Sequence, residues 1–196
     1  MTSMTSPAND TLQIDEKEAK LSNFIRDYLS AGYSEVADSR ELLIVALSTD
    51  SPVVCAVKSV MKEIDAAQAH VRMILATLPE DKPSDHLMAL APIEIRWACN
   101  TRLLDAHEQL VVGPMACWMG DCMRRDPRKR DVFESFTTAC PEAAGWAHVS
   151  FDRLWQASEP LLSLGKDHEV EDHSAALHAA LQLRRGRLNA SLSERH

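Results

Sequence analysis

Apolar residues recur along this chain with two different spacings, and these spacings predict its helices and strands. Between residues 21 and 29 the apolar positions are three or four residues apart, as on one face of an amphipathic helix: Leu21, Phe24, Ile25, Tyr28 and Leu29. Gly32 follows as a natural C-terminal stop. The continuous apolar run Leu42–Leu47 instead suits a strand that is buried on both faces.

A strand–helix–strand unit is predicted from that run onward. Pro52 suits the first position of a helix, where its missing N–H costs nothing. The helix is expected to extend to about Ala69, with these residues facing inward: Val53, Val57, Val60, Met61 and Ile64. Val71–Leu75 is predicted to be the next strand. Two strands joined by a helix predict a parallel pair.

The stretch Ile93–Phe136 carries two further apolar runs and most of the candidate chemistry. We predict strands at Ile93–Cys99 and Gln109–Trp118, because short apolar runs between polar and Gly/Pro residues are typical of buried strands. His107 is placed where the second of these strands begins, and Gly120–Cys122 at a turn.

Two helices are expected after that turn. Asp126-Pro127 favours a helix start, with the helix over Arg128–Phe136. A second helix over Pro141–Ser158 is predicted to end at Pro160 and to bury its large apolar side chains: Trp146, Val149, Phe151, Leu154 and Trp155.

These elements predict an α/β fold with a mixed, mostly parallel β-sheet flanked by helices. We expect residues 1–10, which are small and polar, to be a disordered N-terminus. Residues 11–165 are predicted to form a single α/β domain that starts with the N-terminal helix. Residues 166–196 are predicted to be a helical C-terminal tail with Leu177, Leu181 and Leu188 on it.

Composition limits the classes of function. A chain of 196 residues with 45% hydrophobic and 26% charged residues suits one domain with a real core. The net charge of −8 argues against a general nucleic-acid or anionic-membrane binder, and no apolar run is long enough to cross a bilayer. Five irregularly spaced cysteines and a polar start without a signal peptide predict buried free thiols in a reducing cytoplasm.

Two groups of residues are candidates for chemistry. His107 can act as a nucleophile or as a general acid or base near neutral pH, although a lone histidine at a strand start is more often structural. Gly120, Asp121, Arg124 and Arg125 could form a phosphate-binding corner from backbone N–H groups and guanidinium groups. The plainer interpretation of this second group is a turn followed by a solvated basic surface.

No metal or cofactor is predicted. Cys117 and Cys122 are followed by Cys140 and His148, but a structural zinc site normally ends in a second tight pair, and Cys140 and His148 have seven residues between them. No Gly-rich phosphate loop of the common kinds is present.

Four segments, taken in order, resemble elements of the phospholipase D superfamily from about Leu42 to Leu162: VKSVMKEIDAAQAHVRMILA, IEIRWACNTRLLDAHEQLVVGP, MGDCMRR and FDRLWQASEPL. His107 falls on the histidine of that family's His-x-Lys motif. The resemblance implies a histidine that attacks phosphorus, a lysine that stabilises the phosphate and a second histidine that protonates the leaving group. It also implies a homodimer, in which two histidines face one phosphate.

The motif is altered at each helper position. Gln109 stands at the lysine, Pro114 at the aspartate, and Asp121 and Met123 near the serine and asparagine. We therefore predict a catalytically degenerate phospholipase D-like module for an anionic ligand or a protein partner, with His107 vestigial and Gln109, Gly120, Asp121, Arg124 and Arg125 as ligand-binding residues.

Two alternatives stay open. One is an active phosphodiesterase or nuclease that uses His107, with Arg124 or Arg125 in place of the lysine. The other is a scaffolding protein that binds a partner through its N-terminal helix or its C-terminal tail.

Overall fold

The computed structural model describes residues 7–30, 40–78, 90, 93–98, 106–123 and 134–162, with side chains in the first range from residue 16. The predicted helix start at Asp126-Pro127 and the predicted tail over residues 166–196 lie outside these ranges. The elements in chain order are α1 (Pro7–Ser30), β1 (Glu41–Ala46), α2 (Pro52–Ser59), α3 (Met61–Ala66), β2 (His70–Leu75), β3 (Glu94–Trp97), β4 (His107–Val112), β5 (Ala116–Cys122), β6 (Ser135–Thr137), α5 (Pro141–Ala157) and β7 (Glu159–Leu162).

The described strands form one sheet in the order β6-β5-β4-β1-β2-β3-β7. The predicted mixed α/β architecture is confirmed, and so is the parallel pairing of β1 with β2. The sheet is mostly antiparallel, however, because only β1-β2 and β2-β3 pair in parallel. Short connections explain the difference: strands joined by a tight turn, as β4 and β5 are, must run antiparallel.

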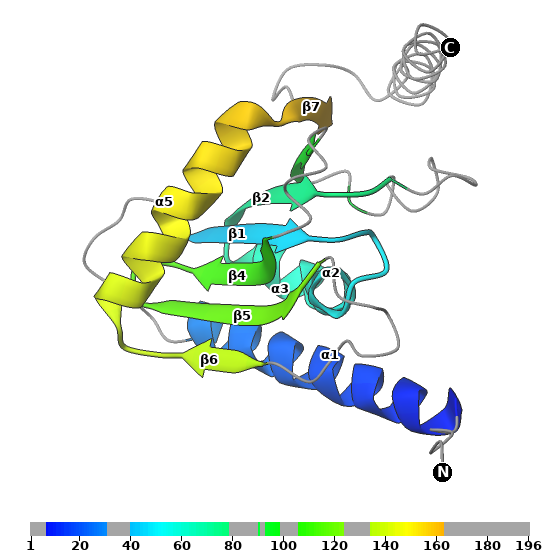
Figure 1. Cartoon of the computed structure of the whole chain (residues 1–196). Coiled ribbons are helices and arrows are strands. Elements are labelled where there is room, and N and C mark those ends of the chain that lie inside the picture. The colour runs from blue at the N-terminus through cyan, green and yellow to red at the C-terminus, as the bar shows by residue number, and fades with distance from the viewer. Residues whose placement is uncertain are drawn as a thin grey trace, which may run out of the picture.

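Helices cover both faces of the sheet. Figure 1 shows α5 on one face and α1, α2 and α3 on the other. Strand β1 is buried on both sides, as predicted: Leu42 and Ile44 pack toward the α1 side, and Leu43 and Val45 toward the α5 side. The apolar stripe of α1 is packed on this core, with Leu21, Ile25 and Leu29 buried.

Two predicted helix boundaries differ from the structure. Helix α1 begins at Pro7, so Pro7–Asp10 of the predicted disordered N-terminus are helical. The helix predicted from Pro52 to about Ala69 is divided into α2 and α3, because Val60 has a non-helical backbone conformation. The inward residues Val53, Val57, Val60 and Ile64 are nevertheless buried.

The strand predicted over Gln109–Trp118 is wrong, because these residues form the β4–β5 hairpin with a turn between Val112 and Ala116. Gly113 makes the turn possible. Its φ is +60°, and an added Cβ would lie 2.6 Å from the Tyr28 hydroxyl of α1. A left-handed conformation and a close approach both favour glycine.

Two further predicted elements, the turn at Gly120–Cys122 and the end of the helix over Arg128–Phe136, differ from the structure. Gly120–Cys122 lie inside strand β5 and not at a turn. Ser135 and Phe136 belong to strand β6, which pairs with β5, and not to a helix. Pairing with the exposed edge of β5 satisfies backbone groups that a helix end would leave to solvent.

Helix α5 confirms the predicted span, but its orientation is not the predicted one. The buried residues are Ala144, Ala147 and Phe151, whereas Trp146 is 75% exposed and Val149 45% exposed. Small alanines on the inner side let the helix backbone approach the sheet closely, which places the larger Trp146 outside.

Candidate functional site

The β4–β5 hairpin brings four of the predicted site residues together. His107 is the first residue of β4 and lies opposite Cys122, and Gln109 lies opposite Met119. The register shifts between His107 and Gln109, as in a β-bulge. Bulges re-aim side chains and are frequent beside functional sites. Gly120 and Asp121 are on the facing strand, next to His107.

His107 is exposed, and its ring is oriented by the hairpin itself. Its Nδ1 lies 2.8 Å from the carbonyl oxygen of Gly120. Because a carbonyl oxygen only accepts hydrogen bonds, this contact requires a proton on Nδ1. In the neutral ring Nε2 is then the basic nitrogen, the atom that can accept a proton or attack an electrophile.

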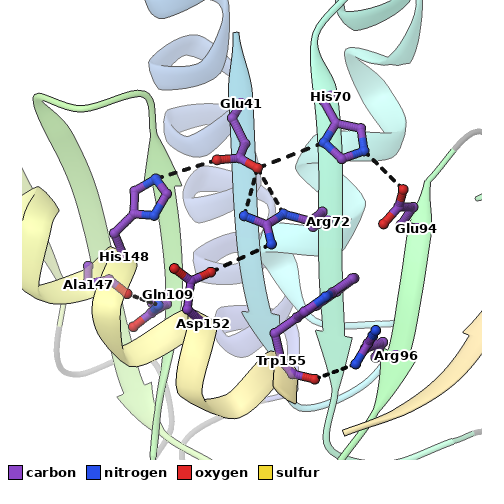
Figure 2. A network of polar contacts seen from close by, with 10 residues as sticks. All are labelled: Glu41, His70, Arg72, Glu94, Arg96, Gln109, Ala147, His148, Asp152 and Trp155. Carbon is purple, nitrogen blue, oxygen red and sulfur yellow. Dashed lines mark hydrogen bonds and ion pairs between the residues drawn. The ribbon is translucent and has the colours of Figure 1, made fainter. Parts of the chain in front are cut away.

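Gln109 is buried under helix α5. It is 7% exposed, and its Nε2 donates to the carbonyl oxygen of Ala147 in α5 at 3.1 Å. The amide thus fastens β4 to α5 (Figure 2). It carries no charge, and its donor is used inside the protein.

Gly120 and Asp121 are both buried. An added Cβ on Gly120 would lie 2.4 Å from a ring carbon of Trp118, so the glycine leaves room for the buried indole. Asp121 is 4% exposed at the end of the hairpin. Asp121 is adjacent in β5 to Cys122, the residue that pairs with His107. Arg124 and Arg125 lie outside the described residues.

A second polar cluster, which sequence reasoning missed, lies on the α5 side of the sheet and is centred on Glu41. Arg72 donates through Nε to Glu41 Oε1 at 2.8 Å, and its Nη2 lies at the same distance from that oxygen. The two histidines His148 and His70 approach Glu41 at 3.5 and 3.8 Å. Figure 2 shows Glu41 between them, with Arg72 also reaching Asp152 of α5.

Aromatic rings and helix carbonyls complete this cluster. The Arg72 guanidinium lies 5.2 Å from the Phe151 ring centroid, and the Arg96 guanidinium lies 4.6 Å from that of Trp155. Arg96 also donates to the carbonyl oxygens of Trp155 and Ser158 at 2.7 and 3.4 Å. A cation at the carboxyl end of a helix interacts favourably with its dipole. We interpret the Glu41 cluster as a clamp that holds α5 on the sheet.

A signal for the clamp was present in the sequence. Glu41, Arg72 and Glu94 are charged residues at the start of apolar strand runs, and their alignment follows from the parallel register. His148 and Asp152 are four residues apart, on one face of α5. The contact between the two sets could not be predicted without knowing which face of α5 is buried.

Cysteine thiols and potential metal ligands are the other reactive side chains of the described residues. Cys55, Cys117, Cys122 and Cys140 are free thiols, and Cys99 lies outside the described ranges. Burial raises the pKa of the Cys117 thiol, against a smaller lowering by its hydrogen bond with Thr137. Within the described ranges, no three His, Cys, Asp or Glu side chains converge as metal ligands. No helix in these ranges combines the length and the apolar character that a membrane span needs.

No protein-family model and no curated protein matches this chain. Solved structures do match. A phospholipase D family member, Nuc from Salmonella typhimurium, is 12% identical over 69% of this chain and 89% of its own, with a TM-score of 0.45. NucT from Helicobacter pylori is 10% identical over 74% of this chain and 93% of its own, with a TM-score of 0.48.

A third match is TrmBL2, an archaeal chromatin protein with a novel mode of DNA binding. It is 12% identical over 72% of this chain and 51% of its own, with a TM-score of 0.47. Likeness at these identities concerns the fold and not the activity. With TM-scores below 0.5, these matches leave the relationship of this chain to the phospholipase D family a resemblance.

Proposed function

We propose that this chain is a catalytically degenerate phospholipase D-like domain that acts as a binding or regulatory module. One observation carries the proposal. The side chain two positions after the exposed His107 is a buried amide that donates to the Ala147 carbonyl of α5. The position at which the family resemblance requires a cation is therefore occupied by a neutral structural contact.

The expected chemical consequence is a large loss of catalysis. Phosphoryl transfer depends on positive groups that stabilise the charge developing on the phosphate oxygens. Gln109 supplies no charge. Removing one such stabilising donor typically costs about 10²–10³ in rate, and here the lysine is absent, while Asp121 stands near the serine position of the motif.

Binding an anionic group requires fewer positive groups than stabilising a transition state does. An imidazole that becomes protonated gains a second N–H donor and a positive charge, which suits an anionic group. The hydrogen bond from Nδ1 to Gly120 already orients the His107 ring. An anionic ligand or an acidic segment of a protein partner is the binding target that this geometry supports. The predicted homodimer is the arrangement in which His107 of a second copy faces the same anionic group.

An active phosphodiesterase is the second candidate, and the Gly120 contact favours it. In a neutral ring with its proton on Nδ1, Nε2 is the basic nitrogen, and a basic ring nitrogen is what a nucleophilic histidine uses. Arg124 or Arg125 would then supply the missing charge. In this case hydrolysis depends on His107 and on one of these two arginines.

The scaffolding alternative has less support, because the apolar stripe of α1 is packed on the core of the chain itself. Deleting residues 1–31 would therefore remove Leu21 and Ile25 from the core, expose the apolar residues that they cover and unfold the domain, whereas deleting residues 165–196 removes only the tail. A partner that is lost with the tail, while the His107→Ala variant keeps it, would favour scaffolding. The free thiols support the predicted cytoplasmic location.

Binding is tested by titrating isotope-labelled protein with inorganic phosphate and with a dinucleotide, while the imidazole resonances are followed by NMR. We expect a saturable shift of the His107 resonances, which the His107→Ala spectrum assigns. The matched control is His148→Ala, which removes another partly exposed histidine and should leave the shift unchanged. If neither probe moves the His107 resonances, the anionic-ligand form of the proposal is wrong.

A further inference from the structure

Four residues form a line along the outward side of α5, and we call it the outer face of α5: Glu142, Trp146, Val149 and Arg153. Their spacing of four, three and four residues places them on one side of a helix. All four are exposed, whereas Ala144, Ala147 and Phe151 on the opposite side are buried against the sheet. Figure 1 shows α5 as the outer layer on this face of the sheet.

The centre of this face is apolar. Trp146 is 75% exposed and Val149 is 45% exposed, on adjacent turns. The clamp around Glu41 fixes the rotation of α5, so Trp146 cannot turn inward without breaking the contacts of Arg72, His148 and Gln109. A tryptophan that a rigid scaffold holds in solvent is typical of a contact surface, because tryptophan is enriched at the centres of interfaces.

The order of the four residues makes the face complementary to itself. If two copies of α5 pack antiparallel about a two-fold axis between residues 147 and 148, Trp146 meets the partner's Val149. The same axis places Glu142 opposite the partner's Arg153, and each contact occurs twice. The alternating spacing of three and four residues is the one that antiparallel helices use when they pack at about 20°.

The flanking residues permit close approach. Gly145 and Ser150 are exchanged by the same axis, and both are small and exposed. Among the described residues, a Cβ added at Gly145 would meet nothing within 4 Å, so their packing does not explain the glycine in the middle of a helix. Glycine there weakens α5, but it lets a second helix lie near the backbone. Glu142 is exposed, and its Oε2 accepts a hydrogen bond from Cys140 Sγ at 3.6 Å.

We propose that the outer face of α5 binds a second copy of this chain, in an antiparallel two-fold helix pair centred between residues 147 and 148. Charge complementarity selects this occupant, because the acidic and basic ends of the face match only when the second helix is reversed. A single helix pair is a small interface, so the dimer is expected to be weak, with a dissociation constant in the micromolar range. The pairing is independent of His107 and of the proposed function.

The first test measures the dissociation constant of the full chain by sedimentation equilibrium. Trp146→Glu should raise the constant at least about thirtyfold, as for the loss of an interface hot spot. Asn23→Glu on α1 adds the same charge at an exposed position on the other side of the sheet and should leave the constant unchanged. His107→Ala should also leave it unchanged. A dimer that His107→Ala dissociates and Trp146→Glu does not would overturn the proposal.

The second test uses the symmetry of the charges. Glu142→Arg and Arg153→Glu each place like charges at both ends of the pair, and each should weaken self-association about twofold to tenfold. When these two variants are mixed, both contacts become opposite in charge, so the heterodimer should form more tightly than either homodimer. The doubly substituted chain should regain the wild-type constant. A wild-type chain that stays monomeric at every concentration, or a mixture without preference for the heterodimer, would contradict the proposed pairing.

Discussion

Replacing Gln109 with lysine would restore the residue that the family resemblance requires, and we expect the change to destabilise the fold instead of creating a hydrolase. The wild-type side chain is 7% exposed and donates to the Ala147 carbonyl oxygen at 3.1 Å. A lysine at this position has its ammonium group beneath α5. An ammonium group has three donors, and the acceptor that Gln109 contacts among the described residues is the Ala147 carbonyl oxygen.

The magnitude follows from two matched variants. Gln109→Met keeps the approximate volume and removes the hydrogen bond, which should lower the free energy of unfolding by about 1 kcal/mol. Gln109→Lys also buries a charge without an identified partner, and we expect a loss of about 2–4 kcal/mol in total. The difference between the two variants isolates the cost of the charge from the cost of the lost amide.

Urea unfolding followed by circular dichroism measures both variants against the wild type, and phosphodiester hydrolysis is measured on the same samples. A lysine variant as stable as the wild type would refute the reasoning, because the position would then accept a cation. Hydrolysis by Gln109→Lys that depends on His107 would refute it as well, since the site would have lacked only the lysine.

Three further changes test the packing around the site. Arg72→Met should lower the free energy of unfolding by about 1–2 kcal/mol, since the partly exposed Glu41 loses its guanidinium, and urea unfolding should show that Glu41→Gln costs less in that background than in the wild type. Gly120→Ala should cost about 1–3 kcal/mol in the same assay, because the added methyl group overlaps the Trp118 ring. Burial raises the pKa of the Cys117 thiol above its usual 9.0, so the folded state keeps a proton that the unfolded chain loses. The free energy of unfolding should therefore fall as pH rises above about 9, and the fall should be smaller in Cys117→Ala.

The centre of the fold could be predicted from the sequence, because its signals are local. The run Leu42–Leu47 could only be a strand buried on both faces, and the Pro52 helix start with Val71–Leu75 after it defined the parallel unit. The β4–β5 hairpin was missed because its turn lies inside one apolar run. Gly113 is the signal of the turn in the sequence. The chain turns there because Gly113 has a positive φ, which only a three-dimensional structure reveals.

The sequence predicted several residues of the candidate site but not how they are arranged in space. His107 and Gly120 do lie side by side, yet Gln109 faces α5, a contact between residues 38 positions apart in the chain. The orientation of α5 was wrong for a related reason. Side-chain size alone suggested that Trp146 is buried, whereas the contacts of Ala147 and Arg72 decide which side of the helix meets the sheet. Sequence periodicity does not contain these long-range contacts.

The central claim is that the site around His107 has lost phosphodiesterase chemistry, and hydrolysis of a chromogenic phosphodiester tests it most directly. The purified wild-type chain and His107→Ala are compared, with a chelator present to silence contaminating metallonucleases. We expect no hydrolysis above the buffer rate by either protein. Hydrolysis by the wild type that disappears in His107→Ala would contradict the claim and would establish the chain as an enzyme.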